Sequence, residues 1–188
     1  QYGEHVKVLE QRKHWSRIRI AYDGYEGWVS NNQITLVPEN IYGELEDSVP
    51  SYSSDVISHV CTSEGVLLPI LLGSVVSSTK YFDHTFEGST LEGGHPKSSL
   101  VDTALLYLKA PYQWGGKTPF GIDSSGFTQM VYKINGHHLR RNAESQSQQG
   151  EALSFIEESE PGDLAFFDNS EGVIDHVGII LKDNYVIH

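Results

Sequence analysis

Apolar and polar residues alternate in the first part of the chain, which is the pattern of short, half-buried strands. Residues 15–20 place two isoleucines on one face and two arginines on the other. Asp23-Gly24 follows as a tight-turn signal, after which residues 25–30 return as a second strand. Short strands joined by turns are typical of a small barrel or sandwich, so residues 1–37 are predicted to form a small all-β unit.

The next segment, residues 38–96, has a less regular pattern. One more strand is predicted just before it, at residues 34–36, and several Pro and Gly residues then separate short apolar pieces. The longest apolar run of the chain, residues 66–72, predicts a buried strand. Residues 38–96 are therefore predicted to form a second small barrel or a linker domain.

Helical periodicity begins after Pro96. Residues 98–108 predict a helix, which Pro111 ends because proline cannot continue it. Residues 124–134 predict a second helix with one apolar stripe. The stripe consists of Phe127, Met130, Val131 and Ile134.

The last part of the chain returns to strand-like patterns. Three strand candidates lie at residues 163–168, 174–181 and 185–188. Because helices precede an antiparallel sheet, residues 97–188 are predicted to form an α+β domain.

The final hairpin carries two histidines whose relative placement depends on strand register. A turn centred on Asp183-Asn184 would pair His188 with Ile179. Whether His176 then lies on the same face as His188 depends on the register, because a slip of one residue turns every side chain to the other face. The sequence does not determine that register.

Composition excludes several classes of protein. The net charge of −12 argues against nucleic acid or an anionic membrane as partner. No run approaches the ~18 apolar residues of a membrane span, and no leader peptide is recognisable at the start, which leaves the compartment open. Cys61 is the only cysteine, so an internal disulfide is excluded. The histidines show no metal-ligand spacing with carboxylates, so no metal and no cofactor are expected.

A candidate site for chemistry lies where a glycine-containing loop meets the start of the second helix, at residues 121–127. A nucleophile such as Ser124 at that point would lie beside unpaired backbone N–H groups and the positive end of the helix dipole. Such an environment lowers the pKa of a thiol and stabilises an oxyanion. The simpler interpretations are a helix-capping Ser-Ser pair and two structural histidines, His176 and His188.

Four ordered motifs decide between these interpretations. Residues 111–127 read PYQWGGKTPFGIDSSGF, and residues 161–167 read PGDLAFF. The third motif, HVGI, begins at His176, and the fourth, IH, begins at Ile187. Together they resemble the NlpC-type cysteine peptidases, in which the first motif reads P-Y-x-W-G-G, a short gap, then D-C-S-G-F. The segment 25–29 is similar to bacterial SH3-like domains.

The resemblance implies a papain-like α+β domain preceded by one or two small SH3-like barrels, the first of them incomplete at its start. By position, Ser124 stands where the family has its cysteine nucleophile. His176 matches the general base, and His188 matches the residue that orients it. The residues matched to substrate contacts are Tyr112, Asp123 and Ser125.

The resemblance also implies an activity. A front of two barrels is similar to the subgroup that cleaves the bond between γ-D-glutamate and a diamino acid in muropeptides such as L-Ala-γ-D-Glu-diaminopimelate. A monomer in the bacterial cell envelope, periplasmic or secreted, is expected, with a cytoplasmic role in muropeptide recycling as the alternative. A barrel loop over the cleft would restrict action to free peptides.

Two positions depart from the family pattern. The usual Arg-Asp after the helix is Arg141-Asn142, which indicates an altered cap or pocket edge. Ser124 replaces the cysteine, and a hydroxyl is far less acidic than a thiol, so activity is expected to fall by orders of magnitude while binding survives. Three explanations stay open: an engineered Cys→Ser change, a natural binding-only relative, or a serine enzyme. The intact remainder of the site favours the first.

Two other classes of function remain beside the hydrolase. One is a natural, non-catalytic module that binds muropeptides. The other is a papain-like acyltransferase, which transfer to an added amine would distinguish from hydrolysis.

Overall fold

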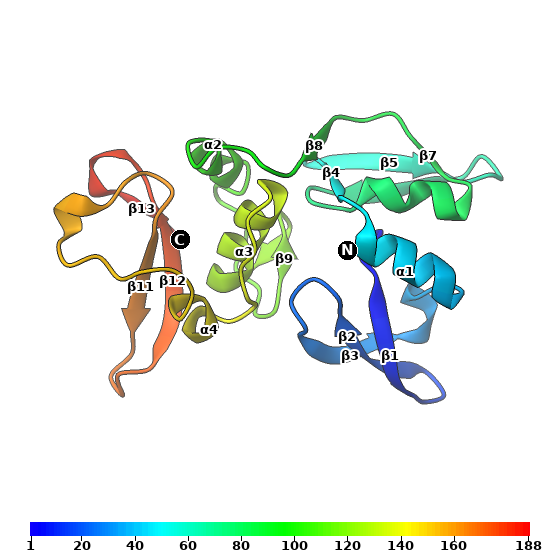
Figure 1. Cartoon of the computed structure of the whole chain (residues 1–188), viewed down its shortest axis with the longest axis horizontal. Helices are drawn as coiled ribbons and strands as arrows, with labels where there is room; N and C mark the ends of the chain where they lie inside the picture. Colours follow the sequence, from blue (N-terminus) through cyan, green and yellow to red (C-terminus); the bar gives the residue numbers. More distant parts are fainter.

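The structure, a computed structural model, describes all 188 residues. An N-terminal sheet and a second β region lie at one end of the elongated molecule, and the C-terminal sheet lies at the other (Figure 1). Helices occupy the middle, so that the helix bearing Ser124 has a neighbour on each side.

The N-terminal region is a three-stranded antiparallel sheet, ordered β1–β2–β3, that follows the predicted alternation. Its strands are β1 (Val6–Gln11), β2 (Trp15–Ile20) and β3 (Glu26–Ser30). Ser16 and Ile18 of β2 are buried, while Arg17 and Arg19 are exposed and pair with Glu26 of β3. The prediction of half-buried strands is therefore confirmed here.

The segment after this sheet differs from the prediction. Residues 34–36 form no strand, and Leu36 is 73% exposed. A short 3₁₀ turn, η1 (Asn31–Gln33), leads instead towards an unpredicted helix, α1 (Glu39–Asp47). Only Leu45 of this helix is buried, so its apolar stripe is too sparse to give a periodic signal in the sequence.

The second region consists of two small antiparallel sheets, β4–β8 and β6–β5–β7. Its elements are β4 (Ser51–Ser53), β5 (Ile57–Cys61), β6 (Leu67–Leu71), η2 (Val76–Phe82), β7 (Thr85–Phe86) and β8 (Thr90–Glu92). The strand predicted within residues 66–72 is present, but the expectation that it is buried is wrong. Leu67 is 63% exposed, and only Ile70 and Leu72 are buried.

The C-terminal region has the predicted order of helices followed by an antiparallel sheet, β11–β12–β13. Its elements are α2 (Ser99–Leu105), β9 (Lys117–Thr118), β10 (Gly121–Ile122), α3 (Ser124–Ile134), α4 (Ala143–Ser147), η3 (Ile156–Glu158), β11 (Leu164–Asp168), β12 (Ile174–Ile180), η4 (Lys182–Asn184) and β13 (Val186–Ile187). The predicted α+β class is thus confirmed.

The main core lies between α2, α3 and β12. Phe127 is 4% exposed, and Met130, Val131 and Ile134 are completely buried, as the apolar stripe of α3 predicted. Ile179 of β12 packs into the same cluster. This packing holds α3 against the sheet that carries the histidines.

The register of the final hairpin differs from the expected one by a single residue. Ile179 faces Ile187, not His188. The turn is centred on Asp183-Asn184 as predicted, and both residues have φ of 60°. However, Tyr185 bonds to both residues that lead from β12 into the turn: its carbonyl accepts from the N–H of Leu181 at 2.6 Å, and its N–H donates to the carbonyl of Lys182 at 3.5 Å. This β-bulge moves the pairing by one position.

The N-terminal sheet is attached directly to the second half of α3. Gln129 Nε2 donates to Asp23 Oδ2 at 2.8 Å, and Lys133 Nζ donates to Glu4 Oε1 at 2.5 Å. The backbone oxygen of Tyr22 hydrogen-bonds to Nε2 of His138, in the loop after α3, at 2.6 Å. The sheet and the helix are therefore joined through polar contacts.

None of the helices combines the length and the apolar character that crossing a bilayer requires. The predicted domain boundaries, between residues 37 and 38 and between residues 96 and 97, fall outside helices and strands. They remain predictions.

Candidate active site

The start of α3 is built by its N-cap residue, Asp123. Its carboxylate oxygen Oδ1 accepts from the N–H of Gly126 at 2.7 Å, which satisfies one of the unpaired donors of the first turn. The N–H groups of Ser124 and Ser125 have no partner within the protein. Two unpaired donors at the positive end of a helix suit a developing oxyanion.

Glycines allow the preceding loop to approach this helix start. A Cβ on Gly126 would lie 2.3 Å from the carbonyl oxygen of Gly116, a distance that only a residue without a side chain permits. The loop is also tied to β10, because Tyr112 forms a parallel bridge with Ile122. These contacts place Tyr112 beside the start of α3, with its side chain 76% exposed.

A buried ion pair organises the same helix start. Arg141 donates to both carboxylate oxygens of Asp123, at 2.9 and 2.6 Å, and the two side chains are 9% and 13% exposed. It also donates to Ser125 Oγ at 2.9 Å. Asp123 Oδ2 additionally accepts from the N–H of Gly115 at 2.8 Å, so both of its oxygens are fully engaged.

This network determines the charge state of Asp123. Burial alone would raise the pKa of the carboxyl group. The hydrogen bonds and charge of Arg141, together with the N–H groups of Gly126 and Gly115, outweigh burial and hold the pKa below its ordinary value. Asp123 is therefore an anion at neutral pH.

The bulge in the final hairpin brings the two histidines together. With Ile179 opposite Ile187, His188 lies on the same face of the sheet as His176. His176 Nε2 and His188 Nδ1 are 2.9 Å apart, and the rings are nearly perpendicular, at 87°. Gly178 makes room for this pair, because a Cβ on it would lie 2.9 Å from the Cβ of His188.

This hydrogen bond leaves Nδ1 of His176 as its available ring nitrogen. Burial, and to a smaller extent the charge of His188, lower the pKa of His176, although Asp175 opposes the shift. A lowered pKa favours the neutral ring at pH 7. If Nε2 carries the proton towards His188, Nδ1 is a free base.

The cavity at the start of α3 has a volume of about 280 Å³ and collects most of the predicted site residues. Those that line it are Tyr112, Asp123, Ser124, His176 and His188. Ser125 does not line it, because its hydroxyl points to the Arg141 network. Ser124 Oγ lies in the same cavity as His176, but no hydrogen bond joins them.

Two residues of the site were not identified from the sequence. Arg141 was named only as the residue before Asn142, the departure from the family's Arg-Asp, yet it is the ion-pair partner of Asp123. Tyr107 lies under the cavity with 4% exposure, and its hydroxyl has no hydrogen-bond partner. Neither role could be found from spacing, because each depends on contacts between distant segments. No group of three or more His, Cys, Asp or Glu side chains is arranged to hold a metal ion.

Comparison with known families agrees with this architecture. Residues 109–188 match the NlpC/P60 family, and residues 1–34 match the bacterial dipeptidyl-peptidase SH3 domain. A crystal structure of an NlpC/P60 family protein from Bacillus cereus superposes with a TM-score of 0.80 at 22% identity. That superposition covers 100% of this chain and 71% of the other.

Curated relatives extend the match over the whole chain. A γ-D-glutamyl-L-lysine dipeptidyl-peptidase of Bacillus cereus is 28% identical over 216 residues, covering 99% of this chain and 65% of the relative. The protein of the same name from Bacillus subtilis is 25% identical over 207 residues, covering 100% of this chain and 70% of the relative. This chain thus spans about two thirds of the length of these relatives. Residues 109–188 are thus similar to the NlpC/P60 family, and the segment before them, residues 1–34, is similar to a bacterial SH3-type domain.

Proposed function

We propose that this protein belongs to the hydrolases of cell-wall peptides that cut the bond between γ-D-glutamate and a diamino acid. The observation that carries the proposal is the cavity at the start of α3. It combines the nucleophile position, Ser124, with a hydrogen-bonded pair of histidines, His176 and His188. The names of the two Bacillus relatives support the substrate class.

In the proposed mechanism, His176 acts as general base through Nδ1 and takes the proton of the nucleophile at position 124. His188 orients the ring and stabilises the imidazolium that forms. The nucleophile attacks the γ-glutamyl carbonyl, and the oxyanion accepts from the free N–H groups at the start of α3 and from Tyr112. His176 then protonates the leaving amine, and water releases the acyl group.

Serine at position 124 weakens this mechanism at its first step. The helix start can lower a thiol pKa from about 8.5 by several units, whereas a serine hydroxyl stays protonated. The chain with Ser124 is therefore proposed to bind its peptide and to cut it only very slowly.

The proposed substrate is a short peptide with a free amino end, such as L-Ala-γ-D-Glu-diaminopimelate or its lysine counterpart. Asp123 lines the cavity and is the proposed neighbour of the free amine, which would share a carboxylate that already accepts from Arg141 and Gly126. Ser125 would act indirectly, because its hydroxyl is bonded to Arg141.

The test compares the protein as it stands with its Ser124→Cys and Ser124→Ala variants, using L-Ala-γ-D-Glu-L-Lys as substrate. We expect the cysteine form to release L-Ala-D-Glu at least about a thousand-fold faster than the other two, since the thiolate is the competent nucleophile. Absence of dipeptide release by Ser124→Cys would refute the proposed hydrolase.

A second candidate is a binding module without catalysis, which the serine at position 124 itself favours. It predicts equal affinity of the Ser124 and Ser124→Cys forms for the tripeptide and no turnover by either. Calorimetric titration together with product analysis separates the two candidates. Appearance of a new amide when an amine is added would instead indicate acyl transfer.

A further inference from the structure

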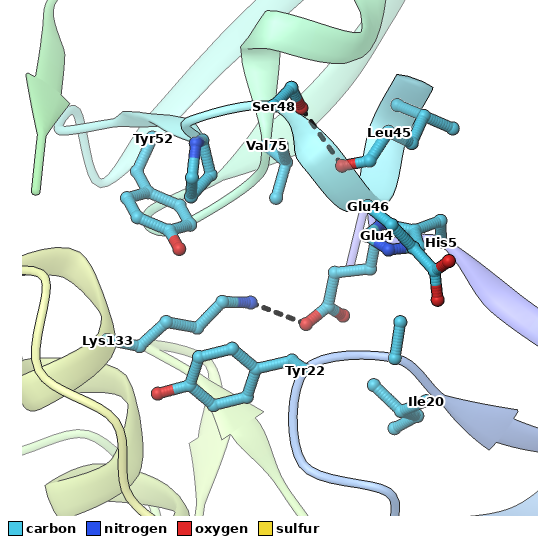
Figure 2. A pocket seen from close by; sticks show the side chains of 12 residues that line it. Glu4, His5, Ile20, Tyr22, Leu45, Glu46, Ser48, Tyr52, Val75 and Lys133 are labelled. Atoms are coloured by element: carbon cyan, nitrogen blue, oxygen red, sulfur yellow. Dashed lines mark hydrogen bonds and ion pairs between the residues drawn. The ribbon is translucent and has the colours of Figure 1, made fainter. Parts of the chain in front are cut away.

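A second cavity, distinct from the candidate active site, lies where the N-terminal sheet, α1, the second β region and α3 meet (Figure 2). Its volume is about 340 Å³, and it shares no lining residue with the cavity around Ser124. This volume is within the range of small-molecule sites, roughly 300–1,000 Å³. Neither the proposed mechanism nor the proposed substrate uses it.

The inner end of this cavity carries a buried ammonium group with unused donors. Lys133 is 2% exposed, and its only hydrogen bond goes to Glu4 at 2.5 Å. Its Nζ lies 4.9 Å from the ring centre of Tyr22 and 5.5 Å from that of Tyr52. An ammonium group has three N–H donors, so two are left for other acceptors.

The charge at this end is positive on balance. Lys117 lies 3.8 Å from the same oxygen of Glu4 that Lys133 contacts. Two lysines thus face one carboxylate. Burial would raise the pKa of Glu4, but these cations hold it well below its ordinary value, so the carboxylate stays ionised and the inner end can accept one more negative group.

A hydroxyl group at the same place also lacks a partner. The Tyr52 side chain lines the cavity, and Figure 2 shows its hydroxyl pointing into the cavity towards Lys133. No protein group bonds to this hydroxyl, so its donor and acceptor capacity faces the open space of the cavity. A ligand carboxylate there would accept from both Tyr52 and Lys133.

The mouth of the cavity has the opposite charge. Glu46 of α1 is exposed there, next to His5 of the N-terminal sheet. Between mouth and inner end the walls are apolar, formed by Ile20, Leu45 and Val75 among others. The cavity therefore has hydrogen-bond donors at its inner end, a carboxylate at its mouth, and apolar side chains between them.

We propose that this cavity is a binding site for a small zwitterion, an amino acid or short peptide with apolar side chains. Its carboxylate accepts hydrogen bonds from Lys133 and Tyr52, and its ammonium group faces Glu46. The site lies at the opposite end of α3 from Ser124 and is separate from the proposed peptidase site.

The experiment titrates the full chain with the dipeptide L-Ala-L-Ala by calorimetry. Matched probes lack one charge each: N-acetyl-L-Ala-L-Ala lacks the ammonium group, and L-Ala-L-Ala amide lacks the carboxylate. We expect saturable binding of the zwitterion and binding at least about ten-fold weaker for both blocked probes, because each loses one charged contact.

Variants locate the site. Tyr52→Phe removes only the unpartnered hydroxyl and should weaken dipeptide binding roughly ten-fold. Glu46→Gln, at an exposed position, should also weaken it. Tyr81 lines neither cavity, so Tyr81→Phe should leave the affinity for the dipeptide unchanged. Tyr112→Phe, at the candidate active site, should also leave it unchanged. Absence of saturable binding, equal binding of the blocked probes, or a loss of affinity in Tyr112→Phe rather than in Tyr52→Phe would overturn the proposal.

Discussion

The two ends of α3 are each held by a buried ion pair, yet the pairs have different surroundings. At the first end, Asp123 and Arg141 belong to the same domain, and both carboxylate oxygens are saturated by hydrogen bonds. At the second end, Lys133 pairs with Glu4 of the N-terminal sheet, and two ammonium donors stay unused. The first pair shapes a helix start that leaves two N–H groups free. The second joins two regions around a cavity.

This difference separates contacts within the candidate active site from contacts that join two regions of the molecule. A saturated network is rigid, and it positions Ser124 opposite the histidines. An incompletely saturated pair retains the capacity to bind something else, because leaving buried donors unpaired is unfavourable. The N-terminal sheet is thus attached to the helix that carries the candidate nucleophile, but at the end away from it.

The largest expected effect is a difference in peptidase activity between variants at the two ends of α3. In the Ser124→Cys form, His176→Gln should reduce kcat/KM by about a thousand-fold, because the general base is lost. Lys133→Met in the same form should stay within a few-fold when assayed well below its unfolding temperature. Peptide hydrolysis measured by product release tests this. Comparable losses in both variants would show that the two ends are not functionally separate.

The next effect concerns stability. Lys133→Met removes the lysine that contacts the Glu4 carboxylate directly, which should cost about 3–5 kcal/mol of unfolding free energy. Combining it with Glu4→Gln should recover part of that loss, since the Glu4 carboxylate that lost Lys133 is then also removed. Urea unfolding measures both. Strictly additive losses in the double variant would contradict a direct interaction.

Low pH should reduce the stabilisation that the ion pairs at both ends of α3 give to the fold. The pKa values of Glu4 and Asp123 are lowered in the folded protein, so their contributions are complete above the ordinary values of 4.5 and 3.8 and are lost as the pH falls further. Each group then contributes a slope of up to about 1.4 kcal/mol per pH unit. Unfolding free energies measured between pH 6 and 3 should show this decline, and Glu4→Gln should make it shallower. An unchanged slope in Glu4→Gln would exclude Glu4 as a source.

The smallest effect concerns the tyrosines. Tyr52→Phe should change the unfolding free energy by less than about 0.5 kcal/mol, because its hydroxyl bonds to nothing in the free protein. Tyr132→Phe is the matched control, since its hydroxyl donates to the carbonyl of Gly162 at 2.5 Å and its loss should cost about 1 kcal/mol. Thermal unfolding compares the two. A larger loss in Tyr52→Phe would reveal a hidden partner and remove the case for a ligand.

Much of the C-terminal fold could be predicted because local signals coincide with burial. The apolar stripe and the N-cap Asp123 define α3, and its end at Asn135-Gly136 follows from the positive φ of 84° at Gly136. The apolar run at residues 66–72 gave a strand but the wrong burial, since local hydrophobicity does not tell whether a strand is covered.

The remainder depends on contacts that no local pattern records. The Asp123–Arg141 pair joins residues 18 positions apart through the chain's return after α3. The pairing of His176 with His188 depends on a bulge that composition does not reveal. The candidate site was therefore predicted by its motifs, whereas its internal geometry required the structure.

The bulge before the final turn has a consequence for insertions and deletions. Leu181 and Lys182 both face Tyr185, so deleting Lys182 would leave a plain two-residue turn and keep His188 on the face of His176. A substitution that flattened the bulge at constant length would turn His188 to the opposite face without altering either imidazole. In this stretch a shorter homologue can keep the pair, and one of equal length can lose it.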